Sequence, residues 1–326
     1  MALTTIGHGS EAARVAVEKQ LTGRKVDWQG KAFHGTVWAA IGMAVIILAA
    51  VIWDVLFDGL PFLLDRGWDF ITADVSSRDN EYGIFEGLRG TFWIGVFVAV
   101  FSFPIGIGAA IYLEEYAPET RMTRFIELNI RNLAGVPSVV YGVLGLAIFV
   151  QLLDGFFPST IDRHLGATTA AAGATLAILV LPIVIITSAE AIRAVPQSLR
   201  EAGYGVGATK WEVTRHHVLP YAAPGILTGT LLSLARALGE AAPLIVIGGV
   251  LGSLGPRSSL FELEQLGEQF TAMPLLITQL AKKPSTIGNW NDATAAAIIC
   301  LLAVVIVANA AAILLRNHFE KKRGSA

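Results

Sequence analysis

Six long apolar segments recur along the chain, and they constrain its fold more than any other feature. They cover approximately residues 37–57, 91–113, 132–153, 168–190, 219–251 and 293–315. A bilayer core about 30 Å thick is crossed by roughly 20 apolar residues in a helix. Because every backbone polar group needs a partner inside the bilayer, such segments predict helices. We therefore expect an all-α integral membrane protein with six transmembrane helices.

The composition agrees with a membrane protein and argues against other classes. Hydrophobic residues make up 54% of the chain, charged residues 15%, and the mean hydropathy is +0.59. The net charge of −2 and the lack of a basic run interleaved with aromatics argue against nucleic acid as a partner. With Cys300 as the single cysteine, and His216 and His217 without acidic companions at ligand spacing, we expect no metal and no cofactor.

The ends of the chain read as tails on a single six-span domain. Residues 1–36 contain charged side chains, no apolar core near Met1 and no A-x-A-like cleavage site, so we expect a solvated tail and not a removable signal peptide. The spans occupy 37–315, which includes a long polar loop at 191–218, and residues 316–326 form a second tail.

Lysine and arginine are unevenly divided between the two sides. Sixteen lie in the two tails and in connections 114–131 and 191–218, whereas seven lie in connections 58–90, 154–167 and 253–292. Cytoplasmic segments retain the excess of positive charge. We therefore expect both termini to be cytoplasmic.

Four prolines inside the apolar segments invite kinks, because proline removes a backbone donor. Broken helices suit a transport path, although small residues within spans also simply allow helices to pack closely. The four are Pro104, Pro137, Pro182 and Pro243.

The most informative polar segment is the connection "EAIRAVPQSLREAGYGVGATKWEVTRHHVLPYAAPG". Its residues predict a helix from about Pro196 to Tyr204, a break at Gly205 and Gly207, a short helix at 210–216, and re-entry at Leu219 and Pro220. Such a compact helical loop between two spans either docks onto a soluble protein or packs on its own bundle.

This loop resembles the E-A-A-x₃-G-x₉-I-x-L-P signature of ABC importer permeases, with Gly203 in place of alanine and His217 in place of isoleucine. Glycine should weaken the first helix by about 1 kcal/mol relative to alanine. The resemblance implies the type I (MetI-like) importer permease fold, in which the loop inserts as a coupling helix into a separate ATP-binding subunit. The coupling residues would be Glu201, Ala202, Gly203, Gly207, Leu219 and Pro220.

Four further stretches narrow the resemblance. "AAIYLEEYAPE" at 109–119, "NLAGVPSVVYG" at 132–142, "GILTGTLLSLARALGEAAPLI" at 225–245 and "FTAMPLLITQLAKKP" at 270–284 look like the phosphate-uptake permeases, and the first and last favour the PstA-type. The resemblance covers roughly 85–315. It implies a phosphate importer of the bacterial inner membrane, in which this chain pairs with a second, PstC-type permease.

The remaining partners are also implied by the resemblance. They are a dimer of ATP-binding cassette ATPases and an extracytoplasmic phosphate-binding protein, which would dock near segments 58–90 and 253–292. The chain itself should be non-catalytic, because a phosphate-binding loop needs Gly-Lys followed by Ser or Thr. The only Gly-Lys pair, Gly30-Lys31, is followed by Ala32.

Arg236 stands near the centre of the fifth apolar segment, where insertion costs roughly 2.5–3.5 kcal/mol. Glu240 is four residues on, so on one continuous helix the two side chains share a face and can pair. We hypothesise that Arg236 contacts phosphate transiently and that Glu240 holds it in place; a purely structural pair is the alternative. Ser138 and Tyr141 are weaker candidates for the path, because such residues often bond to a neighbouring helix.

Two other functions remain compatible with these residues. An arginine does not choose between oxyanions, so a permease for molybdate or sulfate is one alternative. An ion-driven secondary transporter, in which Glu240 titrates with the coupling ion, is the other. Dependence on a separate ATPase distinguishes this second alternative from the importers.

Overall fold

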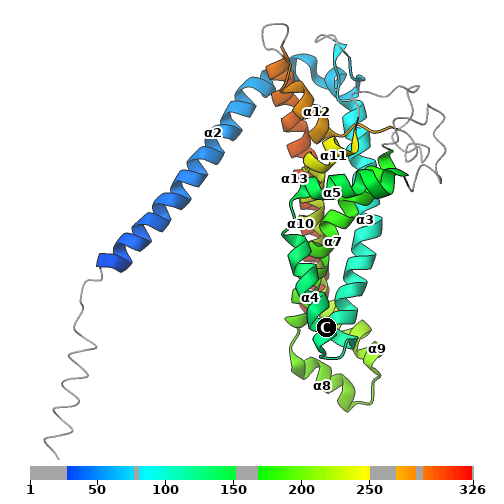
Figure 1. The fold of residues 1–326 in the computed structure, drawn as a ribbon. Coiled ribbons are helices and arrows are strands. Elements are labelled where there is room, and N and C mark those ends of the chain that lie inside the picture. Colours follow the sequence, from blue (N-terminus) through cyan, green and yellow to red (C-terminus); the bar gives the residue numbers. More distant parts are fainter. Residues whose placement is uncertain (1–27, 77–80, 152–167, 250–268, 284–288, 325–326) are drawn as a thin grey trace, which may run out of the picture. The chain divides into compact units, whose positions relative to one another are not determined.

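The computed structural model describes residues 28–76, 81–151, 168–249, 269–283 and 289–324 (Figure 1). These residues are helical, apart from turns and one isolated bridge between Thr168 and Gln269. A bent pair of helices adds a sixth candidate to the five that are long and apolar enough to cross a membrane, so the all-α, six-span prediction is confirmed. The five are α2 (Trp28–Thr72), α3 with its π-helical end η2 (Phe85–Tyr116), α7 (Thr169–Arg193), Lys210–Leu238 and Trp290–Ala311.

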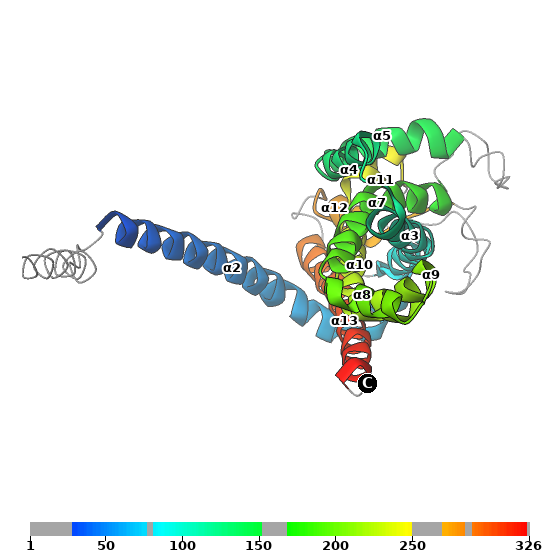
Figure 2. The ribbon, with the colours of Figure 1, turned by 90° about the horizontal axis from the view of Figure 1, so that it is seen from below.

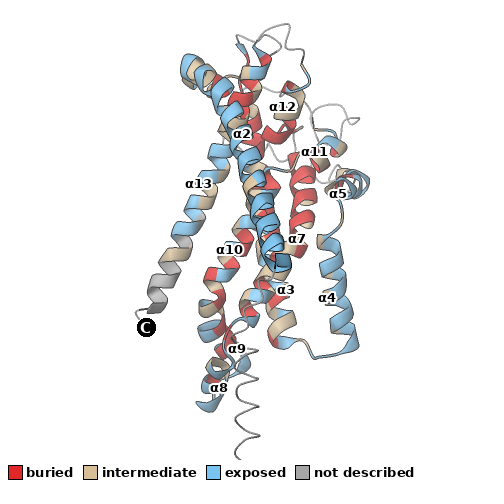
Figure 3. Ribbon diagram, turned by 90° about the vertical axis from the view of Figure 1, so that its left-hand side faces the viewer, coloured by how far each residue is buried: buried red, intermediate tan, exposed pale blue. Residues whose placement is uncertain are grey.

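The first helix is longer than its apolar segment predicts. Helix α2 begins at Trp28, inside the predicted tail, and ends at Thr72, with Gly67 at a non-helical φ of 48°. The chain divides into two compact units, Met1–Asp54 and Val55–Ala326, so most of α2 belongs to the first. The most apolar window of α2 is 0% buried, as its pale blue colour in Figure 3 shows. A helix that is apolar all round and unburied suits a lipid environment.

In the second unit, α7 packs against both α3 (Phe85–Ile111) and α10 (Leu219–Leu238), as Figure 2 shows. Small residues let the helix axes approach closely. At Gly173 of α7, for example, a Cβ atom would lie 2.7 Å from the ring of Phe97 on α3. The buried side chains of this core include Ile94, Val98, Leu176, Val180, Ala237 and Leu244.

The third span is broken. Helix α4 (Arg121–Ala134) is followed by α5 (Ser138–Leu144) and the π-helical segment η3 (Gly145–Val150), and the two parts are bent by 102°. Pro137 lies at the N-terminal boundary of α5, where its missing backbone donor costs nothing. The kink expected there is confirmed, whereas Pro104 and Pro182 lie inside the uninterrupted helices α3 and α7.

The fifth span, predicted over 219–251 with a kink invited by Pro243, is also broken, and the break begins before Glu240. Helix α10 ends at Leu238, and a short helix, α11 (Ala242–Ile247), follows after three connecting residues. Pro243 lies in the first turn of α11, and Gly248 ends it at a positive φ of 95°. The break therefore precedes Pro243, because proline cannot donate to the carbonyl four residues back, at Gly239, and its ring clashes with that carbonyl.

Helices α12 (Met273–Leu280) and α13 (Trp290–Gly324) complete the fold. Lys283 lies 3.4 Å from the ring centroid of Trp290, which joins the end of α12 to the start of α13. Because α13 continues to Gly324, most of the predicted tail at 316–326 is helical. Residues 77–80, 250–268 and 284–288, in the two connections expected to contact a binding protein, lie outside the described residues.

Candidate functional site

The 191–218 connection has the helix, break and helix order that its sequence predicts. Helix α8 (Gln197–Gly205) is followed by a turn, by α9 (Lys210–Val213) and by the π-helical segment η4 (Thr214–Val218), which runs into α10. Thr209 caps α9: its hydroxyl accepts from the Glu212 N–H, and the Glu212 carboxylate accepts from the Thr209 N–H at 2.8 Å. This reciprocal capping box fixes where the second helix starts. We call residues 197–218 the docking segment.

Large apolar side chains are exposed on the docking segment. Val206 is 83% exposed, Trp211 54% and Tyr204 42%. Glu201 and Ala202 beside them are also exposed, Leu219 is half-buried and Pro220 exposed. An aromatic and aliphatic cluster on an otherwise polar loop is the composition expected of a surface that another protein covers.

The structure requires glycine at two positions of the signature, for two different reasons. Gly207 has a φ of +85°, a left-handed conformation that side chains other than glycine and asparagine rarely adopt. Gly203 is buried, and a Cβ there would lie 2.7 Å from Cγ2 of Val213. The departure from alanine at Gly203 therefore makes room for Val213 of α9, so the glycine packs the two short helices together.

Arg200 anchors the docking segment to two other elements. Its Nε and Nη2 donate to Oε1 of Glu115 in η2 at 3.1 and 2.8 Å. Nη2 also donates to the carbonyl of Ile192 at 3.0 Å, and Nη1 to that of Val195 at 2.7 Å. Ile192 is in the last turn of α7, where backbone acceptors have no partner within the helix, and Val195 follows the end of the helix. One guanidinium thus joins η2, the end of α7 and α8.

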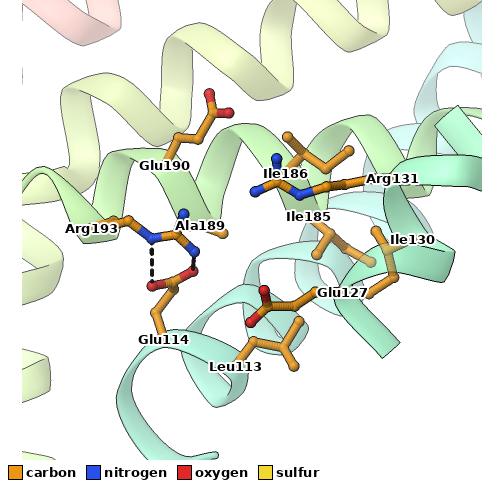
Figure 4. A pocket seen from close by; sticks show the side chains of 10 residues that line it. All are labelled: Leu113, Glu114, Glu127, Ile130, Arg131, Ile185, Ile186, Ala189, Glu190 and Arg193. Carbon is orange, nitrogen blue, oxygen red and sulfur yellow. Dashed lines mark hydrogen bonds and ion pairs between the residues drawn. The ribbon is translucent and has the colours of Figure 1, made fainter. Parts of the chain in front are cut away.

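A second arginine pairs with the neighbouring acid. Arg193 Nε donates to Oε2 of Glu114 at 3.1 Å, and Nη2 to Oε1. Figure 4 shows this pair at one side of a small pocket between η2, α4 and α7, with Glu127, Arg131 and Glu190 nearby.

The two ion pairs differ in exposure. The side chains are 53% and 13% exposed for Arg193 and Glu114, but 13% and 5% for Arg200 and Glu115. Exposed pairs contribute about 0–1 kcal/mol, whereas removing one partner of a buried pair costs about 3–5 kcal/mol.

Arg236 and Glu240 do not lie on one helix. Arg236 is in the last turn of α10, and Glu240 follows Gly239 in the break before α11. Arg236 is exposed, Glu240 is half-buried, and within the described ranges no ion pair joins them. Because the helix ends before the fourth residue is reached, the two side chains do not share a helical face here, and the holding role of Glu240 stays a prediction. A cation in the last turn is instead stabilised by the partial negative charge of the helix end.

Ser138 and Tyr141 both lie in α5, directly after the bend. Tyr141 is buried, and its hydroxyl donates to the carbonyl of Leu133 at 2.9 Å, while Ser138 is half-buried. Helix α5 packs on α11, where a Cβ at Gly142 would lie 2.8 Å from Cα of Pro243. The second halves of the two broken spans are thus in direct contact.

Sequence reasoning missed the four residues of the ion pairs, because their partners are 79 and 85 positions apart. The consecutive acids Glu114 and Glu115 at the end of an apolar segment are the one signal that marks them. Among the residues that the structure describes, no group of His, Cys, Asp or Glu could hold a metal ion.

Comparisons with known proteins agree with this architecture. Residues 102–324 match the family described as "Binding-protein-dependent transport system inner membrane component". The chain is 30% identical over 234 residues to the phosphate transport system permease protein PstC of Xylella fastidiosa, covering 67% of this chain and 72% of the relative. It is 32% identical over 247 residues to PstA 1 of Mycobacterium tuberculosis, covering 76% and 75%. Relatives of both types match similarly, so the preference for the PstA-type stays a prediction.

Solved structures share the fold. A bacterial alginate ABC transporter in complex with a periplasmic protein aligns with a TM-score of 0.62 at 15% identity, covering 93% of this chain and 98% of the other. The methionine ABC transporter MetNI in an inward-facing conformation aligns with a TM-score of 0.52 at 18% identity, covering 73% and 94%. At these identities the likeness concerns the arrangement of helices.

Proposed function

The chain belongs to the binding-protein-dependent transport system inner membrane component family, and from this premise we propose that it is a non-catalytic permease subunit of an ATP-driven phosphate importer. The names of its relatives, PstC and PstA 1, support phosphate as the substrate. The chain would form half of the translocation path and leave ATP hydrolysis to a separate subunit.

The observation that carries this proposal is the docking segment. Its two short helices are fixed by a capping box and by Arg200, and they expose Tyr204, Val206 and Trp211. A rigid, partly apolar protrusion between two spans is what a groove on an ATP-binding subunit would receive. An ion-driven transporter has no need of such a surface.

The docking segment and both termini would lie on the cytoplasmic side, and the excess of Lys and Arg in these segments supports that orientation. The partners there would be two ATPase subunits, and a second permease would complete the path within the inner membrane. An extracytoplasmic phosphate-binding protein would deliver the substrate on the opposite side, where α12 and the start of α13 lie.

For the path we keep Arg236, Ser138 and Tyr141 as candidates and revise the role of Glu240. Arg236 is exposed in the last turn of α10, and its neighbour Ala237 belongs to the same buried cluster as Tyr141 of α5 and Leu244 of α11. A guanidinium offers an anion a planar set of donors. Weak, transient contact suits transit, because a path must release what it binds. Glu240, half-buried in the break, would keep the local charge balanced without holding Arg236 by an ion pair.

The proposal is tested by purifying the tagged chain from detergent-solubilised membranes and identifying the proteins that come with it. We expect an ATP-binding subunit with the wild type, its loss with Gly207→Asp, and its retention with Gly205→Ala, where a Cβ meets open space. Recovery of the chain alone, unchanged by Gly207→Asp, would reject the importer and favour the ion-driven alternative.

The substrate is tested separately with the complete complex in proteoliposomes. We expect ATP-dependent uptake of labelled phosphate that excess molybdate or sulfate does not suppress. Uptake of either of those anions in preference to phosphate would keep the importer and replace its substrate.

A further inference from the structure

The end of α3 is tied to the docking segment by one buried ion pair. Glu114 and Glu115 are consecutive residues of η2, so their side chains leave the helix in different directions. Glu114 meets Arg193, the last residue of α7, and Glu115 meets Arg200 inside α8. Only the second pair crosses from a membrane span to the docking segment.

The geometry of Arg200 makes this connection stiff. Its guanidinium makes four hydrogen bonds, two to Glu115 and one each to the carbonyls of Ile192 and Val195. The guanidinium is planar and its donors have a fixed geometry, so hydrogen bonds to three different residues hold it in a single orientation. The pair is also almost removed from water, which strengthens its electrostatic attraction.

Apolar packing surrounds the same junction. Ala110 near the end of α3, Ile192 and Val195 at the end of α7, and Val213 and Val218 of the docking segment belong to one buried cluster. Hydrophobic packing in the cluster is non-directional, so it holds these elements together without fixing their relative orientation. The hydrogen bonds between Arg200 and Glu115 fix that orientation.

We propose that the Arg200–Glu115 pair transmits displacement of the docking segment to α3 and α7, so that these elements move as one body. This inference rests on the proposed function, because it requires an ATPase that moves the docking segment. Arg200 and Glu115 are positioning residues, since neither contacts ATP or the transported anion. Loss of the pair should uncouple ATP hydrolysis from transport while the subunits still associate.

The test compares Glu115→Gln with the matched control Glu114→Gln in the complete complex in proteoliposomes. The two glutamates are adjacent in the same π-helical turn, and both substitutions remove a charge with little change in shape. We expect Glu115→Gln to lower phosphate taken up per ATP hydrolysed by about 5-fold or more, the low end of coupling between sites. Glu114→Gln should keep the wild-type ratio, because its pair is exposed.

Arg200→Lys provides a second variant, since it keeps the charge and loses the planar fork. We expect an intermediate ratio, with co-purification of the ATPase preserved for all three variants. An unchanged ratio for Glu115→Gln with an assembled complex would overturn the inference, as would an equal fall for both glutamine variants. Failure of the wild type to recover any ATPase would instead reject the proposed function, so the two failures are distinguishable.

Discussion

The hydroxyl of Tyr141 lies 2.9 Å from the carbonyl oxygen of Leu133, across the 102° bend of the third span. Leu133 is near the end of α4, and its carbonyl also accepts from the Val136 N–H at 3.1 Å. The tyrosine therefore adds a second hydrogen bond to a backbone carbonyl at the break, and it does so from the helix that follows the break. Tyr141, which the sequence suggested as a candidate for the path, thus also stabilises the bend between α4 and α5.

Tyr141→Phe should weaken the bend, because it removes one of the two donors to the carbonyl of Leu133 and leaves the Val136 N–H as the other. We expect a loss of about 0.5–1.5 kcal/mol, seen as a lower midpoint of thermal unfolding in detergent. Tyr112→Phe is the matched control, since Tyr112 is 58% exposed, and it should leave the midpoint unchanged. Equal midpoints for both variants would show that the hydrogen bond contributes nothing.

Gly207→Ala should destabilise the docking segment by about 1–2 kcal/mol, because its φ of +85° is unfavourable for a residue with a Cβ. Gly207→Asn should cost less, since asparagine tolerates this conformation. Gly205→Ala is the control: its backbone is helical and a Cβ meets nothing within 4 Å. Retention of the ATP-binding subunit during purification should follow the order Gly205→Ala, Gly207→Asn, Gly207→Ala. A different order would show that the backbone at Gly207 does not limit docking.

Gly203→Ala should also weaken the docking segment, although alanine occupies this position in the signature that the loop resembles. The added Cβ would lie 2.7 Å from Val213, so the two short helices must separate. Val213→Ala in the same chain should restore most of the lost stability. A double-mutant cycle on the thermal midpoint measures this coupling, and strictly additive effects would disprove it.

Arg236→Gln should abolish phosphate uptake while the complex still assembles, if Arg236 contacts the anion. Glu240→Gln should act independently of it, because the break separates the two residues and no ion pair joins them in the described structure. Because Arg236→Gln leaves no uptake to compare, independence is measured on the free energy of unfolding, where the effects of the two single variants should add in the double variant. Loss of assembly with Arg236→Gln would assign the arginine a structural role.

The sequence predicts the features of this fold that depend on local composition. Apolar length and hydropathy identified six spans, and Gly207 with Pro196 identified the two helices of the docking segment. Pro243 indicated a kink in the fifth span, but the start of the break at Gly239 could not be located, because "LARALGEAAPL" remains compatible with a helix up to that proline. The pairing of Arg200 with Glu115 could not be predicted at all, because it depends on how α3, α7 and α8 pack, which no local pattern encodes.

The π-helical segment η4 joins the docking segment to α10 without a flexible turn. A π-helical turn holds one more residue than an α-helical turn. Since each residue of an α-helix advances the rotation by about 100°, that single residue sets the angle at which the docking segment faces its partner relative to the span. Deleting one residue from 214–218 would rotate α8 and α9, with the exposed side chain of Trp211, by about that angle relative to α10. The number of residues in η4, as well as their chemistry, therefore sets the direction in which the docking segment faces a partner.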